Sequence, residues 1–262
     1  MNYPLFLRKT FAFSFVFFYL STVLHAGGGK EREPLRDGVI IASTSWAAAL
    51  ARCGGAQNIR VLAPADLRHP PEYELKPSDL NAASKASLII YSGWEMFAKK
   101  LAETAGSAGV RILQIELTND PVEVKGEAKR IAELLGTTEK YDTWAAGFDA
   151  CLEDIRSSIF EAYAGKRIVV NRMQTPFVKW LGLEITGEYG PAEPSPALIL
   201  ELVNTKPAIV IDNYHSPSGM PIAEAAHVPY IELINFPGKG GTETIEDVFL
   251  HNADMLVKAA RQ

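Results

Sequence analysis

Short apolar runs alternate with helix-forming segments along this chain, and that alternation restricts its fold more than any other feature. The run Val39–Ala42 ends in the small polar residues 43–45, as expected of a buried strand that leads into a capped helix. Further strands are expected at 59–62, 88–91 and 111–115, and helices at 46–53, 76–84 and 95–105. Strands that alternate with helices in this way are typical of a parallel sheet covered by helices.

A second half repeats the alternation after a long helical segment. Apolar residues recur at helical spacing between residues 122 and 163, with a weak interruption at 136–141. Strands are then expected at 167–170, 183–187, 208–211 and 230–233, and helices at 175–181, 195–203, 219–226 and 242–260. We therefore predict an α/β protein of two lobes, at 38–120 and 165–262, whose mainly parallel sheets are joined by one long connecting helix within 122–163. A cleft between two such lobes is the default place for a ligand.

The first 26 residues have the layout of a secretory signal peptide. Arg8 and Lys9 precede an apolar run from Thr10 to Leu24, and Ala26 is followed by three glycines. The apolar run of about 15 residues is shorter than the roughly 20 that span a bilayer, which favours export and cleavage over a membrane anchor. We therefore expect a periplasmic or secreted protein. Removing residues 1–26 takes away two positive charges, so the mature chain is more acidic than the full chain, whose formal net charge is -5.

Charge and missing motifs exclude several function classes. The isoelectric point is about 5.6 and no segment is strongly basic, so we expect no nucleic-acid partner. The sequence has no phosphate-binding loop, no nucleophile elbow and no H-E-x-x-H motif, and we expect no enzyme activity. Residues 238–241 are rich in glycine but lack the spacing of a phosphate loop, so we expect a mobile loop there.

Two cysteines are too few for a disulfide scaffold and lack the spacing of a zinc site. Cys53 ends the first expected helix, and Cys151 lies in an apolar stripe with Phe148, Leu152 and Ile155. A free cysteine packs in such a stripe as a small hydrophobic residue. We therefore predict two free thiols, although export would permit a bridge.

Several segments, in a fixed order, carry a resemblance to a known family. They are Ile40–Trp46, Pro70–Asp79, Ala86–Gly93, Phe177–Glu184, Pro191–Ser195 and the pair His251–Asn252. The sequence Pro-Pro-Glu-Tyr-Glu-Leu-Lys-Pro-Ser-Asp at 70–79 is similar to the family's most specific motif. Over nearly the whole chain after residue 26, the sequence resembles the substrate-binding proteins of bacterial ABC importers for zinc and manganese.

The resemblance implies two lobes joined by a rigid helix, with a metal ion between them and an inner-membrane ABC permease as partner. It also implies a monomer that carries Zn²⁺ or Mn²⁺ as cargo and has no organic cofactor. The family's four metal-ligand positions fall on Pro71, Val122, Asn171 and Asn235 of this chain. Proline and valine donate nothing, and asparagine offers a neutral carbonyl oxygen, whereas zinc takes three or four N, S or carboxylate ligands. The family's histidine-rich loop is also missing.

Other residues could supply metal ligands in place of those four. His69 lies two residues before the position of the lost histidine, on the same loop. Asp212 and His215 follow an expected strand, and strand ends face the crevice in such folds. We therefore name His69, Asp212 and His215 as candidate metal ligands, with Glu116 in reserve. Against this, a lone loop histidine near prolines is more often a solvated surface group.

Our interpretation is an exported solute-binding protein of an ABC importer, with zinc, manganese or a metal complex as cargo. One alternative is a divergent member that binds a small polar organic ligand through Trp46, Tyr73, Asn171 and Asn235, because amide and aromatic side chains suit a polar ligand. Another alternative is an adhesion or accessory protein that keeps the scaffold and has lost metal transport.

Overall fold

The computed structural model describes residues 38–261, which lie within one compact unit. The signal peptide predicted at 1–26 lies outside these residues. The first four strands form a sheet in the order β2–β1–β3–β4, with every pairing parallel. They are β1 (Ile40–Ala42), β2 (Ile59–Val61), β3 (Leu88–Tyr91) and β4 (Arg111–Gln114). Its helices are α1 (Ser45–Cys53), α2 (Pro77–Ala83) and α3 (Ala98–Ser107), and a 3-10 turn spans Pro70–Glu72. We call these elements the first lobe.

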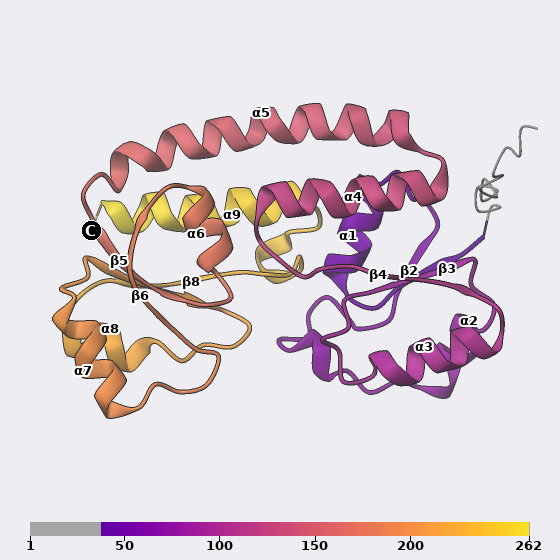
Figure 1. Cartoon of the computed structure of the whole chain (residues 1–262), viewed down its shortest axis with the longest axis horizontal. Coiled ribbons are helices and arrows are strands. Elements are labelled where there is room, and N and C mark those ends of the chain that lie inside the picture. Colours follow the sequence, from indigo (N-terminus) through magenta and orange to yellow (C-terminus); the bar gives the residue numbers. More distant parts are fainter. Residues whose placement is uncertain (1–37, 262) are drawn as a thin grey trace, which may run out of the picture. The chain divides into compact units, whose positions relative to one another are not determined.

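Helices cover both faces of this sheet, as Figure 1 shows. On one face, Ile40 and Ile90 belong to the same apolar cluster as residues of α1. On the other face, Ile41 and Ile89 pack with residues of α2 and α3. A strand buried on both faces needs an unbroken apolar run, and β1 and β3 have one.

The second lobe repeats this plan with a sheet in the order β6–β5–β7–β8, again with every pairing parallel. Its strands are β5 (Arg167–Asn171), β6 (Glu184–Tyr189), β7 (Ile209–Asn213) and β8 (Tyr230–Leu233). Its helices are α6 (Thr175–Trp180), α7 (Pro196–Asn204), α8 (Met220–Ala226) and α9 (Ile245–Ala260), and residues Lys239–Gly241 form a 3-10 turn. The two-lobe α/β fold predicted from the alternation is confirmed.

Two helices, not one, fill the segment expected to be a single connector. α4 (Pro121–Leu135) ends at Gly136, whose φ of 69° is left-handed and stops the helix, and α5 (Thr138–Ala162) then runs back along it. α4 packs on α1 of the first lobe, whereas α5 packs on both α1 and α9. The 25-residue helix α5 is therefore the element that bridges the lobes.

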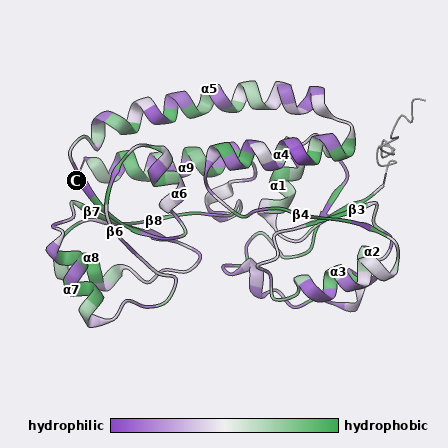
Figure 2. Cartoon of the chain, viewed as in Figure 1, coloured by the Kyte–Doolittle hydropathy of each residue, from purple (hydrophilic) through white to green (hydrophobic). Residues whose placement is uncertain are grey.

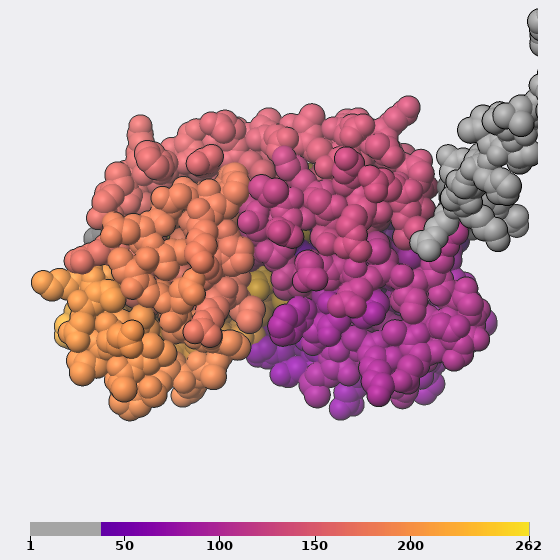
Figure 3. Space-filling model, viewed as in Figure 1, coloured from indigo at the N-terminus to yellow at the C-terminus, as the bar shows by residue number. Residues whose placement is uncertain are grey.

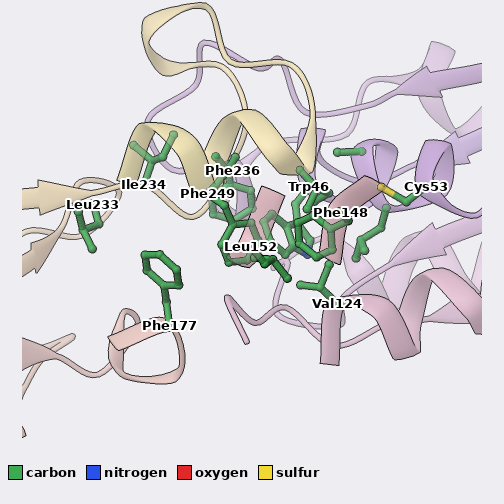
Figure 4. Close-up of a cluster of buried hydrophobic side chains, with 14 of the residues drawn as sticks. Trp46, Cys53, Val124, Phe148, Leu152, Phe177, Leu233, Ile234, Phe236 and Phe249 are labelled. Carbon is green, nitrogen blue, oxygen red and sulfur yellow. The ribbon is translucent and has the colours of Figure 1, made fainter. Parts of the chain in front are cut away.

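The buried face of α5 joins the cores of the two lobes. Phe148, Leu152, Ile155 and Ile159 recur at helical spacing and are buried, and most of the exposed residues of α5 are polar (Figure 2). The ring of Phe148 lies 5.4 Å from that of Phe249 on α9, centroid to centroid. Figure 4 shows this apolar cluster, which also includes Trp46 from α1. One continuous core therefore crosses from lobe to lobe.

Helix α3 begins three residues later than expected because a buried carboxylate shapes the loop before it. Glu95, which is 3% exposed, accepts hydrogen bonds from the backbone N–H groups of Ser92 and Gly93 at 3.0 and 2.7 Å. It also accepts one from the Ser43 hydroxyl at the end of β1. These bonds hold residues 92–95 as a tight turn, and the helix begins at Ala98.

Cys53 and Cys151 are free thiols, as predicted. Burial raises the pKa of the Cys53 thiol well above its usual value, which disfavours the reactive thiolate form. Within residues 38–261 no helix is both long enough and apolar enough to cross a membrane.

Candidate functional site

The carboxyl ends of both sheets face one cavity of about 280 Å³ between the lobes. Ligands of open parallel sheets bind at this end of the strands. The first lobe contributes His69, Pro71, Trp94 and Leu117, and the second contributes Met173, Pro191, Asn213, His215, Ser216, Asn235 and Phe236. Figure 3 shows residues of the two lobes, indigo to magenta and orange, side by side along a hollowed strip. A ligand in this cavity would touch both lobes.

Apolar side chains make up most of the cavity wall. Six of its side chains are proline, leucine, methionine, tryptophan or phenylalanine, and the polar ones are two histidines, two asparagines and a serine. Among the described residues that line it, none is Asp, Glu, Cys, Lys or Arg. The wall therefore suits a neutral ligand or a cation that neutral donors can hold.

His69 is placed in the cavity by the turn that follows it. It precedes the 3-10 turn at 70–72, and its carbonyl accepts the Glu72 N–H at 3.0 Å. Arg68, the residue before it, donates from Nε to the Tyr214 carbonyl at 3.2 Å, and its guanidinium lies over the Tyr214 ring. Within the described part of the chain, no group hydrogen-bonds the half-buried His69 imidazole. Its nitrogens are therefore available to a ligand, as the prediction of a metal-ligating role requires.

His215 also lines the cavity, but both of its ring nitrogens are engaged. Nδ1 donates to the Arg68 carbonyl at 2.9 Å, and Nε2 accepts the Phe236 N–H at 3.3 Å. This pattern requires a neutral imidazole with the proton on Nδ1. Burial, more than any nearby charge, lowers the pKa of His215 to about 4, which keeps the ring neutral. His215 therefore ties the first lobe to the second, and it has no free nitrogen to offer a metal.

Asp212 does not reach the cavity, because the backbone around it uses its carboxylate. It is fully buried and accepts the N–H groups of Ser218 and Gly219 at 2.8 and 2.6 Å. The Tyr230 hydroxyl donates to the same oxygen at 2.9 Å, and the Asn171 amide donates to the other oxygen at 2.8 Å. Burial and the charge of Asp212 raise the pKa of Tyr230, so the phenol keeps its proton. Asp212 therefore fixes the loop after β7, and in this arrangement it has no lone pair directed at the cavity.

The two asparagines predicted to contact a ligand have different positions. Asn171 is fully buried at the end of β5, where its side-chain oxygen accepts the Met173 N–H at 3.0 Å, and it does not line the cavity. Asn235 does line the cavity, and its side-chain oxygen accepts hydrogen bonds from Asn119 at 3.2 Å and from Gln174. The cavity therefore includes one of the two asparagines.

A buried amide network forms the floor beneath Asn235, and the sequence analysis missed three of its members. Asn119, in the loop before α4, donates to Gln174 Oε1 at 3.1 Å as well as to Asn235. Gln174 Nε2 donates to Asn213 Oδ1 and to the Leu233 carbonyl, both at 3.2 Å. All four amide side chains are at most 4% exposed. The one sequence feature that these four residues share is a position at or near the end of an expected strand or just before an expected helix.

Trp46, Tyr73 and Glu116 lie outside the cavity. Trp46 is fully buried in the core, which corrects the expectation that its ring is open to a ligand. Tyr73 donates to Asp79 at 2.8 Å and packs edge-on against Phe97 on the other face of the first sheet. Glu116 is exposed and does not line the cavity. The cavity instead includes Trp94 and Met173, which no sequence motif had indicated.

The residues present do not fit a four-coordinate site for bare zinc. Across residues 38–261, no three or more His, Cys, Asp or Glu side chains lie close enough to hold a metal ion. Of the four positions to which the resemblance assigns metal ligands, Pro71 and Asn235 line the cavity, Asn171 is buried, and Val122 is 65% exposed on α4. A manganese site, which takes oxygen ligands, fits no better, because the wall has no carboxylate.

Comparison with known proteins identifies the fold. No protein-family model matches the sequence, and no curated protein matches it. Among solved structures, the chain is similar to the laminin-binding protein Lmb of Streptococcus agalactiae, described as a bifunctional protein with adhesin and metal-transporting activity. That match has a TM-score of 0.68 and 18% identity and covers 86% of this chain and 100% of the other.

Two further structures have the same fold. The chain is similar to the periplasmic zinc-binding protein TroA from Treponema pallidum, with a TM-score of 0.64 and 16% identity over 86% of this chain and 99% of the other. It is also similar to the AdcAII protein of Streptococcus pneumoniae, with a TM-score of 0.68 and 16% identity over 85% of this chain and 99% of the other. The two-lobe architecture is thus shared over nearly the full length of these proteins.

Proposed function

We propose that this chain is an exported solute-binding protein that presents a transition metal, as an ion or a small complex, to an ABC importer. The observation that carries the proposal is the cavity at the facing carboxyl ends of the two sheets, where the free imidazole of His69 meets side chains of the second lobe. A ligand in this cavity would be held by both lobes at once.

Two further observations support a transport role. The fold is that of proteins described as metal-transporting or zinc-binding, which makes metal the first class of cargo to test. The predicted signal peptide would deliver the chain to the compartment where such proteins meet their permease. Among the described residues, the cavity wall has two histidines and a serine but no carboxylate to orient a catalytic histidine, which argues against a hydrolase.

The few metal-binding atoms of the cavity wall favour a metal ion that stays partly coordinated by water or by a small chelator. Among the described residues that line the cavity, His69 alone has an imidazole nitrogen that no protein group engages, whereas zinc takes four ligands in a tetrahedral array. The cavity of about 280 Å³ has room for several water molecules or a small chelator beside the ion. We therefore expect a partly hydrated or chelated cargo when the metal is divalent.

Metal content of the purified protein, measured by inorganic mass spectrometry, tests this proposal, followed by titration of the metal-free protein. We expect a transition metal to co-purify and to be lost in His69→Ala. The matched control is His227→Asn, because His227 is exposed at the end of α8 with a left-handed φ of 54° that asparagine tolerates. A protein that binds no transition metal more tightly than millimolar would contradict the proposal.

A further inference from the structure

We propose that the cavity is selective for a soft monovalent cation of the Cu(I) class, held between the His69 imidazole and the Met173 thioether beneath the Trp94 ring. This inference rests on the proposed function and specifies its cargo. All three side chains line the same cavity, and His69 and Met173 belong to opposite lobes. An ion bound by both would therefore bridge the lobes.

Met173 has a fixed position at the cavity wall. Its backbone N–H donates to the Asn171 side-chain oxygen at 3.0 Å, and the Gln174 N–H donates to the Asn171 carbonyl at 2.8 Å. Asn171 is itself held by fully buried Asp212 at 2.8 Å. The turn that carries the thioether is thus anchored to the most heavily hydrogen-bonded carboxylate of the second lobe. That arrangement fixes the backbone from which the Met173 side chain extends at the cavity wall.

Hydrogen bonds also hold the opposite wall. The Met96 N–H donates to the Pro71 carbonyl at 2.9 Å, which ties the loop of Trp94 to the turn that follows His69. The buried carboxylate of Glu95 accepts the N–H groups of that loop. Trp94 is 71% exposed, yet the backbone on both sides of it is anchored. An exposed tryptophan at the edge of a cavity is well placed to cover a bound cation through its π face.

The chemistry of these donors separates soft metals from hard ones. The thioether sulfur is the donor that selects Cu(I), because imidazole nitrogen binds zinc as well as copper, whereas structural and catalytic zinc, manganese and magnesium sites do not draw on thioether ligands. Cu(I) is satisfied by two or three donors, and the cavity offers a nitrogen, a sulfur and an aromatic face. An uncharged wall also penalises a monovalent cation less than a divalent one, because the desolvation cost rises with charge.

The test is an anaerobic titration of the metal-free protein with Cu(I) in competition with bathocuproine disulfonate, repeated with Ag(I), which is stable to oxidation. Thiolates bind Cu(I) strongly, so the measurement is made with Cys53→Ala/Cys151→Ala, whose wild-type residues are both free. We expect one Cu(I) or Ag(I) per chain in this background. Quenching of the Trp94 fluorescence, absent in Trp94→Phe, reports the location.

Two substitutions and one control assign the donors. We expect Met173→Leu, which keeps the side-chain volume, and His69→Ala each to weaken Cu(I) and Ag(I) binding by at least about tenfold, the equivalent of about 1.4 kcal/mol. Met220→Leu is the matched control, since Met220 is 47% exposed on α8 and does not line the cavity, and it should leave the affinity unchanged. Zinc affinity, where measurable, should not respond to Met173→Leu.

The outcomes separate this inference from the proposed function. If Cu(I) and Ag(I) bind but Met173→Leu has no effect, the inference is overturned. If zinc binds more tightly than Cu(I) and its binding depends on His69, the inference is overturned while the proposed function stands. If no transition metal binds, both are overturned.

Discussion

The side-chain amide of Asn119 donates to Asn235 Oδ1 across 3.2 Å, and this bond joins the loop before α4 to the loop after β8. The resemblance assigns a metal ligand to the position of Asn235. In this chain the side-chain oxygen of Asn235 is bonded to the neutral amide of Asn119, from the opposite lobe, and not to a metal ion. The floor of the cavity is therefore closed by amide hydrogen bonds that need no ion.

The first prediction concerns the stability of that floor. Asn119→Ala removes two hydrogen bonds and leaves Gln174 Oε1 and part of Asn235 Oδ1 without their donor in a buried site. We expect the free energy of unfolding to fall by about 1–3 kcal/mol. Urea denaturation measures the change, and Asn204→Ala is the control because Asn204 is exposed at the end of α7. Equal stability of the two variants would show that the network contributes nothing.

The second prediction concerns motion between the lobes. One apolar core crosses the lobes beneath α5, and Ser45 on α1 also donates to the Pro237 carbonyl at 2.8 Å. Few backbone bonds are free to act as a hinge, so we expect small-angle X-ray scattering curves of the metal-free and metal-loaded protein to coincide. A marked compaction on addition of metal would show that the lobes close as strand-hinged binding proteins do.

More of the fold than of the site could be predicted from the sequence, because strands and helices leave a pattern of apolar residues and loop geometry does not. A buried parallel strand must be apolar throughout, so runs such as 88–91 are visible in the sequence, and so is the alternation that builds two sheets. Strand ends at Asp212 and Asn171 were also located correctly. Whether their side chains face a cavity or the adjoining backbone depends on the geometry of the loops. The pattern of apolar residues does not predict that geometry.

The sequence also does not predict that Trp94 and Met173 line the cavity, because that too depends on how the loops fold. Tryptophan and methionine are ordinary core residues, and nothing in the sequence shows that these two line a cavity between the lobes. His69 was recognised because an imidazole on a loop carries its own chemistry. His215 was recognised for the same reason, but its engagement by Arg68 and Phe236 depends on contacts 147 and 21 residues away in sequence.

The third prediction concerns the thiols. Cys53 is buried and Cys151 is half-buried, and both are free. Reaction with a thiol reagent in denaturant should titrate two groups per chain. Under native conditions Cys53 should react much more slowly than Cys151, because burial both shields it and raises its pKa further. Finding no reactive thiol in denaturant would reveal a disulfide and contradict the structure.

The fourth prediction concerns Asp212, which organises the second wall without lining the cavity. In Asp212→Asn, the side-chain NH₂ replaces an oxygen that accepts from Ser218, Gly219, Tyr230 or Asn171, so donor would face donor. We expect a loss of about 2–4 kcal/mol in the free energy of unfolding. Metal affinity should also fall, because the bond that orients the Asn171 side chain, and through it the turn of Met173, is weakened. Chemical denaturation and the metal titration measure the two effects. If the variant is destabilised but folded and its metal affinity is unchanged, then metal binding by Met173 does not depend on Asp212.

The last prediction is a loss of stability at acid pH that originates in His215. Burial lowers its pKa from 6.5 to about 4 in the folded protein. Between these two values the unfolded chain binds a proton that the folded chain does not, so the contribution of His215 is complete above pH 6.5 and falls as the pH drops towards 4. The full effect on the free energy of unfolding is of the order of 3 kcal/mol.

Urea denaturation at several pH values in this range should show a steeper decline in stability for wild type than for His215→Gln, which has no titrating group at that position. Burial also lowers the pKa of His251, but that residue is common to both proteins and cancels in the comparison. Parallel pH profiles for wild type and variant would mean that His215 is protonated within the fold and that its bond to Arg68 does not fix a neutral ring.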